Sequence, residues 1–378
     1  MRTKCPCRKL LLINLSGLYI HIPFCHSKCV YCDFYSTPRR GGMDEFVDGL
    51  IKEFIFRRTE IPTPFSTVYL GGGTPSILSE QNLEKIFNLI LPYCSAQEIT
   101  IEANPEDITK DKVDFWREIG INRLSIGVQS LDDNILRRLG RRHSSKKALE
   151  AINIIRSAGI SNISADLIYA LPGLTSESWR TALRTIFSTG IKHLSAYCLT
   201  YHEGTSLHRM LKNGKIIATP DEEIECQFEI LRNESLDAGF EHYEISNLSL
   251  PGFRSRHNSS YWSADSVWLG LGPSAHSFDG RIRRIDYSDT GRWLNSLPSP
   301  FEIEDESELD LINDIIVTSL RTFEGLDLNV IPEEYRDSIL KDAASFISEG
   351  HMRLHDNRLS IPSSRWLMSD FYIRELIR

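Results

Sequence analysis

The sequence of 378 residues predicts an α/β fold, in which a partial (β/α)6 barrel is followed by a smaller α+β domain. Three observations support this prediction. Short apolar runs alternate with amphipathic stretches from Leu18 onward. The runs are mostly apolar on both faces, as buried parallel strands are. Each run also ends in a polar or glycine-rich segment, and barrels of this kind carry their functional groups at those strand ends.

Six predicted strands make up the barrel: Leu18–Ile22, Thr67–Leu70, Glu98–Ala103, Arg123–Val128, Asn162–Ile168 and His193–Leu199. The amphipathic stretches between them predict helices at Asp44–Arg58, Glu80–Leu91, Lys110–Ile119, Ser145–Ser157 and Ser176–Ser188. Ser79 and Thr109 precede two of these helices and are expected to cap them, because a hydroxyl accepts from a free N–H of the first turn. Six strand–helix units in series imply a parallel sheet that curls into a partial barrel.

A loop directly after the first strand carries Cys25, Cys29 and Cys32. Spacings of four and three residues bring the three sulfurs to one side of a tight loop, which favours an iron–sulfur cluster. Two alternatives stay open. A disulfide would leave one thiol unpaired, and zinc would need a fourth ligand such as His26 or a remote cysteine. With three thiolates, one iron of a four-iron cluster keeps an open coordination position.

The second strand ends in Gly71–Gly73, followed by Thr74 and Pro75. Residues without a Cβ atom let the backbone approach a ligand closely, although a tight turn with no ligand explains the run equally well. The run is not a phosphate loop, since no Lys-Ser or Lys-Thr pair follows it.

The other strand ends carry single polar residues. Glu102 ends the third strand and could accept hydrogen bonds from a pair of ribose hydroxyls. Gln129, Asp166 and Thr200 belong to the next three strands, and each is ambiguous alone. Arg141 lies in a run of four arginines, which is either a solvated helix face or a site that recognises a carboxylate.

The second half of the chain adds a predicted helix, Asp221–Ala238, and a strand, Phe240–Ile245. The segments 256–262 and 268–277 then bring together Trp, Tyr and two histidines, His257 and His276, near a glycine-rich turn. This pattern fits ordinary packing. It also fits a flat apolar pocket with an imidazole ligand, which is what a haem requires.

An acidic segment, Phe301–Asp310, marks the start of a C-terminal domain. It is predicted to begin with two helices, Leu309–Leu320 and Pro332–Glu349. A hairpin of Met352–Leu354 and Arg358–Ile361 follows, and then a last helix from Ser364. The order resembles a winged helix, but the acidic composition favours a lid that supports the barrel over a DNA-binding module. The expected organisation is an N-terminal extension (1–16), the barrel (17–245), a connecting segment (246–300) and this domain (301–378).

The formal net charge of −8 argues against nucleic acid as a partner and leaves at most peripheral membrane contact. No apolar run is long enough to span a bilayer. Eight cysteines without regular spacing, in a chain lacking an export signal, indicate a reducing compartment, and we expect a cytoplasmic protein. Cys5 and Cys7 lie in the basic N-terminal extension, which is read as a poorly ordered segment with a targeting role left open.

The CxxxCxxC loop with Tyr31 beside its last cysteine resembles the hallmark of radical S-adenosylmethionine (SAM) proteins. Over essentially the whole chain the sequence resembles the oxygen-independent coproporphyrinogen III oxidase (HemN-like) family, and within it the HemW branch of proposed haem chaperones. Three features favour that branch. Phe34 stands where the oxidases carry a fourth cysteine, the arm before Tyr19 is short, and residues 257–262 match the HNxxYW motif associated with haem binding.

The resemblance implies a radical SAM barrel with a HemN-type C-terminal domain and a [4Fe-4S] cluster on Cys25, Cys29 and Cys32, whose open iron binds the amino and carboxylate groups of SAM. Residues that match a first SAM site are Tyr19, Gly72, Glu102 and Thr200. Residues that match a second SAM site are Gly73, Thr74, Gln129, Arg141 and Asp166, while Tyr31 matches one of the two. His257 is the expected haem ligand, with His276 as the second choice.

Two functions follow from the resemblance. The first is a haem chaperone that binds haem and transfers it to an acceptor protein. The second is an oxidoreductase that decarboxylates coproporphyrinogen III in porphyrin biosynthesis. Both need an electron donor such as flavodoxin or ferredoxin. Phe34 and the HNxxYW motif favour the first, and the sequence names neither the acceptor nor the oligomeric state.

Overall fold

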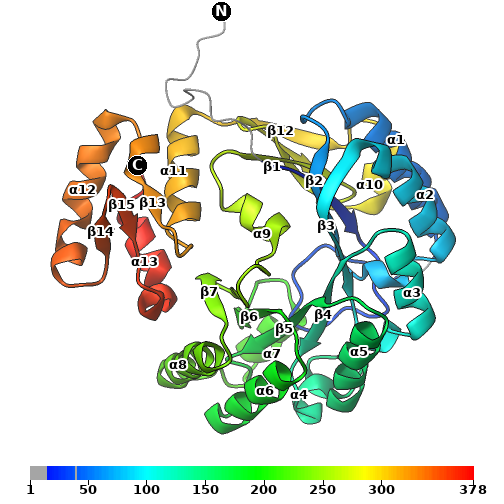
Figure 1. Cartoon of the computed structure of the whole chain (residues 1–378), viewed down its shortest axis with the longest axis horizontal. Helices are drawn as coiled ribbons and strands as arrows, with labels where there is room; N and C mark the ends of the chain where they lie inside the picture. The colour runs from blue at the N-terminus through cyan, green and yellow to red at the C-terminus, as the bar shows by residue number, and fades with distance from the viewer. Residues whose placement is uncertain (1–14, 39–40) are drawn as a thin grey trace, which may run out of the picture.

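The computed structural model describes residues 15–38 and 41–378 (Figure 1). Most of the predicted N-terminal extension, with Cys5 and Cys7, lies outside the described residues. The main sheet has 12 strands in the order β12-β11-β10-β9-β1-β2-β3-β4-β5-β6-β8-β7. Its parallel centre runs from β9 to β6, and antiparallel strands extend it at both edges. The sheet therefore curls into a barrel that stays open.

The six predicted parallel strands are confirmed as β1 (Leu15–Ile22), β2 (Phe65–Gly72), β3 (Cys94–Ala103), β4 (Arg123–Gln129), β5 (Asn162–Tyr169) and β6 (His193–Cys198). The intervening helices are α1 (Met43–Arg57), α2 (Glu80–Ile90), α3 (Lys110–Glu118), α4 (Asp133–Arg138), α5 (Ser145–Ser157) and α6 (Ser176–Ser188). Ser79 and Thr109 cap α2 and α3 as predicted, since each hydroxyl accepts a backbone N–H of the first turn. The short α4 was not predicted from the sequence.

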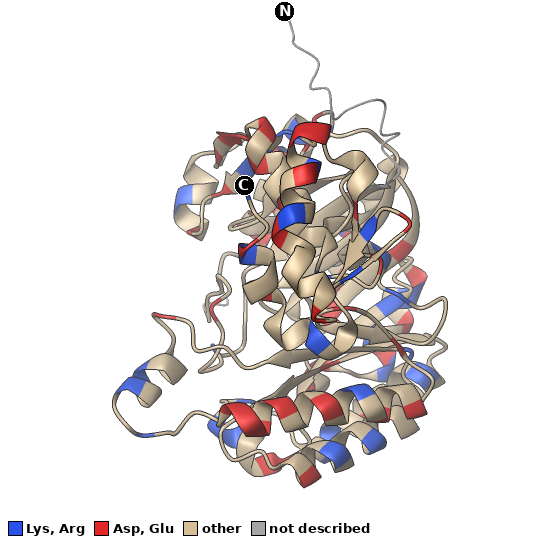
Figure 2. Ribbon diagram, turned by 90° about the vertical axis from the view of Figure 1, so that its left-hand side faces the viewer, with Lys and Arg blue, Asp and Glu red and all other residues tan. Residues whose placement is uncertain are grey.

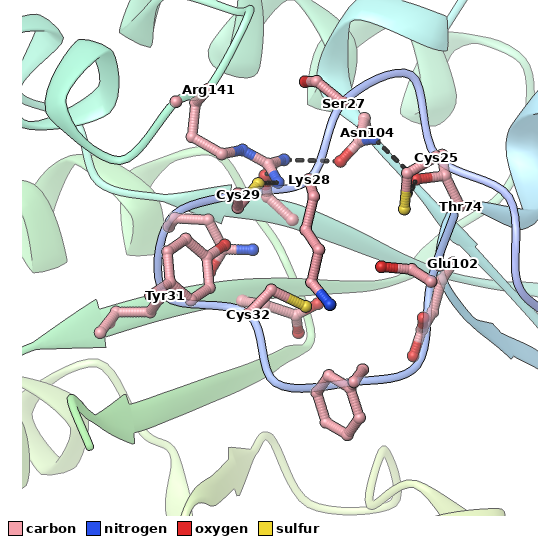
Figure 3. Close-up of a pocket in the computed structure, with 18 of the residues that line it drawn as sticks. Cys25, Ser27, Lys28, Cys29, Tyr31, Cys32, Thr74, Glu102, Asn104 and Arg141 are labelled. Atoms are coloured by element: carbon pink, nitrogen blue, oxygen red, sulfur yellow. Dashed lines mark hydrogen bonds between the residues drawn. The ribbon is translucent and has the colours of Figure 1, made fainter. Parts of the chain in front are cut away.

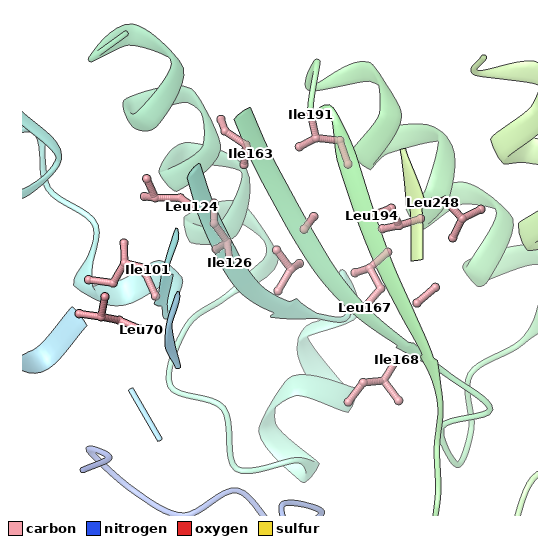
Figure 4. Close-up of a cluster of buried hydrophobic side chains, with 14 of the residues drawn as sticks. Leu70, Ile101, Leu124, Ile126, Ile163, Leu167, Ile168, Ile191, Leu194 and Leu248 are labelled. Carbon is pink, nitrogen blue, oxygen red and sulfur yellow. The ribbon is translucent and has the colours of Figure 1, made fainter. Parts of the chain in front are cut away.

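The helix-facing side of the sheet holds the apolar core. Five fully buried side chains project from successive strands into the layer between the sheet and the helices (Figure 4): Leu70, Ile101, Leu124, Ile163 and Leu194. Burying one such side chain contributes about 1.5–3 kcal/mol.

The side of the strands that faces the barrel interior is polar, which differs from the expectation of strands apolar on both faces. Alternation along each strand places Glu98, Arg123, Ser164 and His193 inside, and all four are buried. Some of these groups are hydrogen-bonded to one another. Ser164 Oγ, for example, lies 2.7 Å from His193 Nδ1. An open barrel has room inside for such polar groups.

After β6 the chain forms α7 (Ser206–Lys212), α8 (Asp221–Asp237), β7 (Glu241–Glu244), β8 (Asn247–Ser249), α9 (Arg256–Tyr261), β9 (Ser266–Leu271), β10 (His276–Phe278), β11 (Ile282–Asp286), α10 (Thr290–Asn295) and β12 (Phe301–Asp305). The sequence did not predict β9, which pairs in parallel with β1. Gly270 weakened the strand signal, and the structure needs it because a Cβ there would lie 2.2 Å from the His276 carbonyl oxygen.

Helix α9 lies in the open gap of the barrel, between the β1–β3 side and the C-terminal unit (Figure 1). Its first N–H groups donate to a buried carboxylate, Arg256 N to Glu98 Oε2 and His257 N to Glu98 Oε1, both at 3.0 Å. Negative charge at a helix N-terminus is favourable. Glu98 therefore fixes α9, and the HNxxYW residues with it, against the inner face of the sheet.

The C-terminal unit contains α11 (Glu308–Ser319), β13 (Leu326–Asp327), α12 (Glu333–Ser348), β14 (Arg353–His355), β15 (Arg358–Ser360) and α13 (Ser369–Arg374). Its small sheet has the order β13-β15-β14, and the first two predicted helices and the hairpin are present. The last predicted helix, from Ser364, begins as a 3-10 helix over Ser363–Met368 and is α-helical only from Ser369. It joins the barrel beside β7, where Ile245 N donates to Arg321 O (3.0 Å) and Phe323 N to Tyr243 O (2.9 Å).

Charged side chains of both signs are interspersed on the side that Figure 2 shows. Among the helices of the described residues, none combines the length and the apolar character needed to cross a bilayer.

Candidate cofactor site

A cavity of about 440 Å³ opens at the carboxyl ends of the barrel strands (Figure 3). Its volume falls in the range of small-molecule sites. The predicted site residues that line it are Cys25, Cys29, Tyr31, Cys32, Gly72, Gly73, Thr74, Glu102, Gln129, Arg141, Asp166 and Thr200. Tyr19 and His257 do not line it. Residues from all six strand ends thus meet in one place.

The cysteine loop is anchored at both ends by backbone hydrogen bonds, from Cys25 N to Thr37 O (3.0 Å) and from Val30 N to Leu139 O (3.2 Å). The side chains of Cys25, Cys29 and Cys32 are directed into the space that the loop encloses (Figure 3). Burial raises the pKa of the Cys25 thiol, and it raises the pKa of Cys32 to about 11. Bound iron has to displace these protons, because the thiolate is the ligand.

The three thiols fit a four-iron cluster, in which each thiolate binds a different iron. Within the described residues no three His, Cys, Asp or Glu side chains are grouped as a single metal ion would need. His26, the fourth ligand that zinc was expected to need, is paired instead with Asp107, whose Oδ1 lies 2.9 Å from His26 Nε2. Ser76 Oγ donates to the other oxygen of Asp107 at 2.8 Å.

Arg141 is the one arginine of its run that reaches the cysteines. Its Nη2 donates to Asn104 Oδ1 (2.6 Å) and to the Gly127 carbonyl (2.7 Å), while Nη1 lies 3.5 Å from Cys29 Sγ. Figure 3 shows the guanidinium directed at the loop. A cation held here offsets the negative charge of thiolates and can also attract a ligand carboxylate.

Two carboxyl groups form the deep wall of the cavity. Glu102 accepts from Tyr69 OH (2.7 Å) and from Gly72 N (3.1 Å), and burial raises its pKa to about 7. Asp166 accepts from Ser125 Oγ (3.0 Å), and burial raises its pKa as well. Both groups can accept hydrogen bonds from hydroxyl or ammonium groups of a ligand.

The glycine run is required by packing against β1. Gly72 has φ +104°, and a Cβ on it would lie 2.6 Å from Cε1 of the His21 ring. A Cβ on Gly73 would lie 2.7 Å from the Phe24 carbonyl oxygen. His21 and Phe24 lead directly into the cysteine loop, so the glycines let the end of β2 pack closely against the loop.

His257 does not line the cavity, and its role as the haem ligand stays a prediction. It is 1% exposed, and both ring nitrogens have partners inside the protein: Nδ1 lies 2.8 Å from Thr67 Oγ1, and Nε2 lies 2.8 Å from Tyr261 OH. Its ring stacks on Tyr69 at a centroid distance of 5.1 Å. In this structure the two ring nitrogens are therefore engaged by Thr67 and Tyr261.

The other two expected residues also lie away from the cavity. Tyr19 OH is 3.1 Å from His21 Nδ1, below the cysteine loop. His276 is exposed at the start of β10 and does not line the cavity. The motif 257–262 therefore fastens α9 inside the barrel in this structure, and Tyr19 supports His21.

We expect His257→Ala to lower the free energy of unfolding by about 2–4 kcal/mol, because it leaves a cavity and unpaired hydroxyls at Thr67 and Tyr261. Chemical denaturation of the two proteins measures the difference. A change below about 0.5 kcal/mol, as at an ordinary surface position, would contradict the structural role.

The same variant has a predictable pH dependence. Burial lowers the pKa of His257 from 6.5 to about 3. The unfolded chain binds this proton below about 6.5 and the folded chain does not, so the stability that His257 contributes is complete above that pH. It is lost as the pH falls toward 3, and the difference from His257→Ala should shrink over this window.

Several lining residues were missed by the sequence analysis: Lys28, Asp33, Asn104, Arg142, Cys198 and His202. Lys28 and Asp33 flank the cysteines, and that position could have drawn attention to them. Cys198 ends β6, and its thiol is hydrogen-bonded to the Tyr169 hydroxyl. His202 follows β6 in a loop, where no periodic pattern or spacing signals a site.

Comparison with known proteins agrees with this geometry. The model of the Radical SAM superfamily matches residues 19–186. The protein "Heme chaperone HemW" of Bacillus subtilis (strain 168) is 32% identical over 351 residues, which cover 87% of this chain and 91% of that protein. The protein of the same name from Synechocystis sp. is 33% identical over 92% of this chain and 89% of its own length.

The solved structure titled "Coproporphyrinogen III oxidase (HemN) from Escherichia coli is a Radical SAM enzyme" superposes with a TM-score of 0.84. It covers 96% of this chain and 90% of its own at 21% identity, which shows the shared fold. With the sequence relatives at 32 and 33% identity over most of both chains, the chain belongs to the HemW family of radical SAM proteins.

Proposed function

We propose that this protein is a haem chaperone, which binds haem beside a [4Fe-4S] cluster and SAM and passes it to an acceptor protein. One observation carries the proposal: relatives named as haem chaperones are 32 and 33% identical over 87 and 92% of the chain. The cysteine loop supports it. The position two residues after Cys32 is Phe34, an exposed aromatic side chain on the cavity wall and not a fourth thiol.

Membership of the radical SAM superfamily implies the cluster and SAM as cofactors. In the proposal, Cys25, Cys29 and Cys32 would hold three irons of the cluster, which would leave the fourth iron for SAM. Glu102, Gly72 and Thr200 line the wall for a first SAM, with Glu102 accepting from its ribose hydroxyls. When bound, the cluster supplies an electron for reductive chemistry on SAM.

A second SAM is proposed on the set Gly73, Thr74, Gln129, Arg141 and Asp166, all of which line the cavity. Arg141 is suited to a carboxylate of that ligand, since its guanidinium is already oriented by Asn104 and Gly127. Thr74 Oγ1 donates to Cys25 Sγ (3.5 Å) and accepts from Asn104 Nδ2 (3.2 Å), so it also supports the cysteine loop.

The alternative function is oxygen-independent oxidation of coproporphyrinogen III. The shared fold with HemN and the expected SAM residues around the cavity, all but Tyr19, favour it. A haem acceptor belongs to the chaperone proposal alone, and an electron donor such as flavodoxin or ferredoxin belongs to both functions.

One sample distinguishes the two functions. The protein is reconstituted anaerobically with iron and sulfide, and half is titrated with ferric haem while half receives coproporphyrinogen III, SAM and a reductant. We expect saturable haem binding and no decarboxylated porphyrinogen. Turnover without haem binding would replace the chaperone by the oxidase.

A further inference from the structure

Two helices of the barrel hold the cysteine loop from its flanks. Val30, inside the CxxxCxxC motif, donates its N–H to the carbonyl oxygen of Leu139 at the end of α4 (3.2 Å), and its own carbonyl oxygen accepts from the N–H of Leu207 in α7 (2.8 Å). A Cβ on Gly140, the next residue after α4 and its cap, would lie 3.9 Å from Cα of Cys29. A partner that contacts the exposed sides of α4 and α7 therefore lies directly beside the cysteine loop.

Basic side chains gather on this part of the molecule. Seven exposed residues form what we call the basic surface: Lys28 on the cysteine loop, Arg137, Arg138 and Arg142 on and after α4, and Arg209, Lys212 and Lys215 on and after α7. Within residues 15–38 and 41–378, none of the seven forms an ion pair with a carboxylate. The segments that carry them, 23–38, 132–144 and 200–219, hold eight Lys or Arg and four Asp or Glu. Because the whole chain has a net charge of −8, this is a local excess of positive charge on an acidic protein.

The acidic residues of the same segments are mostly engaged. Asp132 caps α4 by accepting two backbone N–H groups of its first turn, and Asp133 accepts from Ser145 N (2.7 Å). Asp33 lies 3.4 Å from the ring of His202. A partner with an excess of acidic residues therefore meets an attractive field here, which speeds its encounter with the chain and orients it.

An apolar side chain lies at the edge of the basic surface. Ile217 is 84% exposed, more than any other large hydrophobic residue in the described part of the chain. It lines a groove together with Gly173, and a Cβ on Gly173 would lie 3.1 Å from Nη2 of Arg138. Protein interfaces combine apolar contacts with a polar rim. Binding in a membrane interface needs a whole apolar helix face, so a single isoleucine favours a protein partner.

We propose that the basic surface docks an acidic one-electron carrier protein, of the flavodoxin or ferredoxin class, beside the cysteine loop. The proposal rests on the cluster of the proposed function and deepens it, because it gives the electron donor a place on this chain. It holds for the chaperone and for the oxidase alike. One electron passes from the carrier to the cluster, so the carrier is oxidised and the cluster reduced by one electron, and no bond forms or breaks. Electron transfer slows steeply with distance, which is why a surface next to the loop suits a carrier.

Electron transfer to the full-length, cluster-reconstituted protein tests the surface. Flavodoxin hydroquinone is mixed with the protein in a stopped-flow instrument, and its oxidation is followed at low and at high salt. The rate with wild type should fall by about 10-fold or more as the salt rises, because salt screens the attraction. Arg138→Glu combined with Lys212→Glu should be at least about 10-fold slower than wild type at low salt and should lose most of the salt dependence. Its affinity for oxidised flavodoxin, measured by flavin fluorescence without any electron transfer, should fall in parallel.

Lys341→Glu combined with Arg374→Glu is the matched control. Both residues are exposed on the C-terminal unit, and the change in net charge is the same. This protein should react with flavodoxin as wild type does. Dithionite, a small reductant that needs no docking surface, should reduce the cluster of all three proteins to the same extent.

Docking at the basic surface is overturned if Arg138→Glu with Lys212→Glu binds and oxidises flavodoxin like wild type, or if the control loses as much. It is also overturned if dithionite reduces the wild-type cluster and flavodoxin does not. Should the variant instead lose only its binding to vesicles with about one-third phosphatidylserine, the surface serves a membrane and the proposal is wrong. In these cases the proposed function stands. A wild-type protein that takes up no cluster would end the proposed function, and this inference with it.

Discussion

Replacing Cys29 by alanine is expected to remove the iron–sulfur cluster completely. The loop offers three thiolates as ligands of the cluster. A cluster held by only two of them would be lost readily. Iron and sulfide content after anaerobic reconstitution should fall from about four of each to near zero. The same outcome is expected for Cys25→Ala and Cys32→Ala.

Two other cysteines provide controls. Cys226 is exposed on α8, far along the chain from the loop, and Cys226→Ala should keep a full cluster. Cys198 lines the cavity and is the sharper test, because it could serve as a fourth ligand. We expect Cys198→Ala to keep the cluster too. Loss of iron in Cys198→Ala would contradict the three-cysteine assignment.

Glu102→Gln is expected to weaken SAM binding by about 10- to 150-fold, the size of one to two hydrogen bonds to a charged acceptor. The change keeps the shape of the side chain and its contact with Tyr69, but it removes the negative charge. Because the pKa of Glu102 is raised to about 7, the carboxylate forms as the pH rises through that value. Wild-type affinity should rise over this interval, and the affinity of Glu102→Gln should not follow.

Equilibrium binding of SAM to the cluster-loaded protein, one pH unit below and one above that pKa, measures both effects. Glu106→Gln is the control, a carboxylate of the same cavity with no assigned contact to SAM. If Glu102→Gln binds SAM with the same affinity and the same pH dependence as wild type, Glu102 is not part of the SAM site.

Gly72→Val is a poor test of the same site, contrary to what the sequence suggests. From the glycine run alone, the substitution should block SAM and spare the cluster. The structure gives Gly72 a φ of +104° and places a Cβ 2.6 Å from the ring of His21, four residues before Cys25. The variant should therefore disturb the cysteine loop as well.

The sequence predicted the elements that depend on local patterns. Helices α5 and α6 begin and end at the predicted residues, because each combines an amphipathic stretch with a Ser or Thr cap. The cysteine loop was recognised because its ligands are neighbours in the chain. The short α4 and α9 were missed, since six residues carry too little periodicity to be detected.

The sequence could not predict how deeply an individual side chain is buried. A histidine in an aromatic motif looks the same whether it faces a cavity or, like His257, is sealed between Thr67 and Tyr261. His202 was overlooked for a different reason, because Asp33, which it contacts, is remote in sequence and the two meet only where two loops come together. Arg141 was singled out, but its contact with Cys29 required the tertiary structure.

The central claim, that this radical SAM protein binds haem as its cargo, is tested most directly by titrating the cluster-loaded wild-type protein with ferric haem and following the haem absorption band. We expect saturation at one haem per chain and an absorption band shifted from that of free haem. Absence of saturable binding, in protein that carries its full cluster and binds SAM, would contradict it.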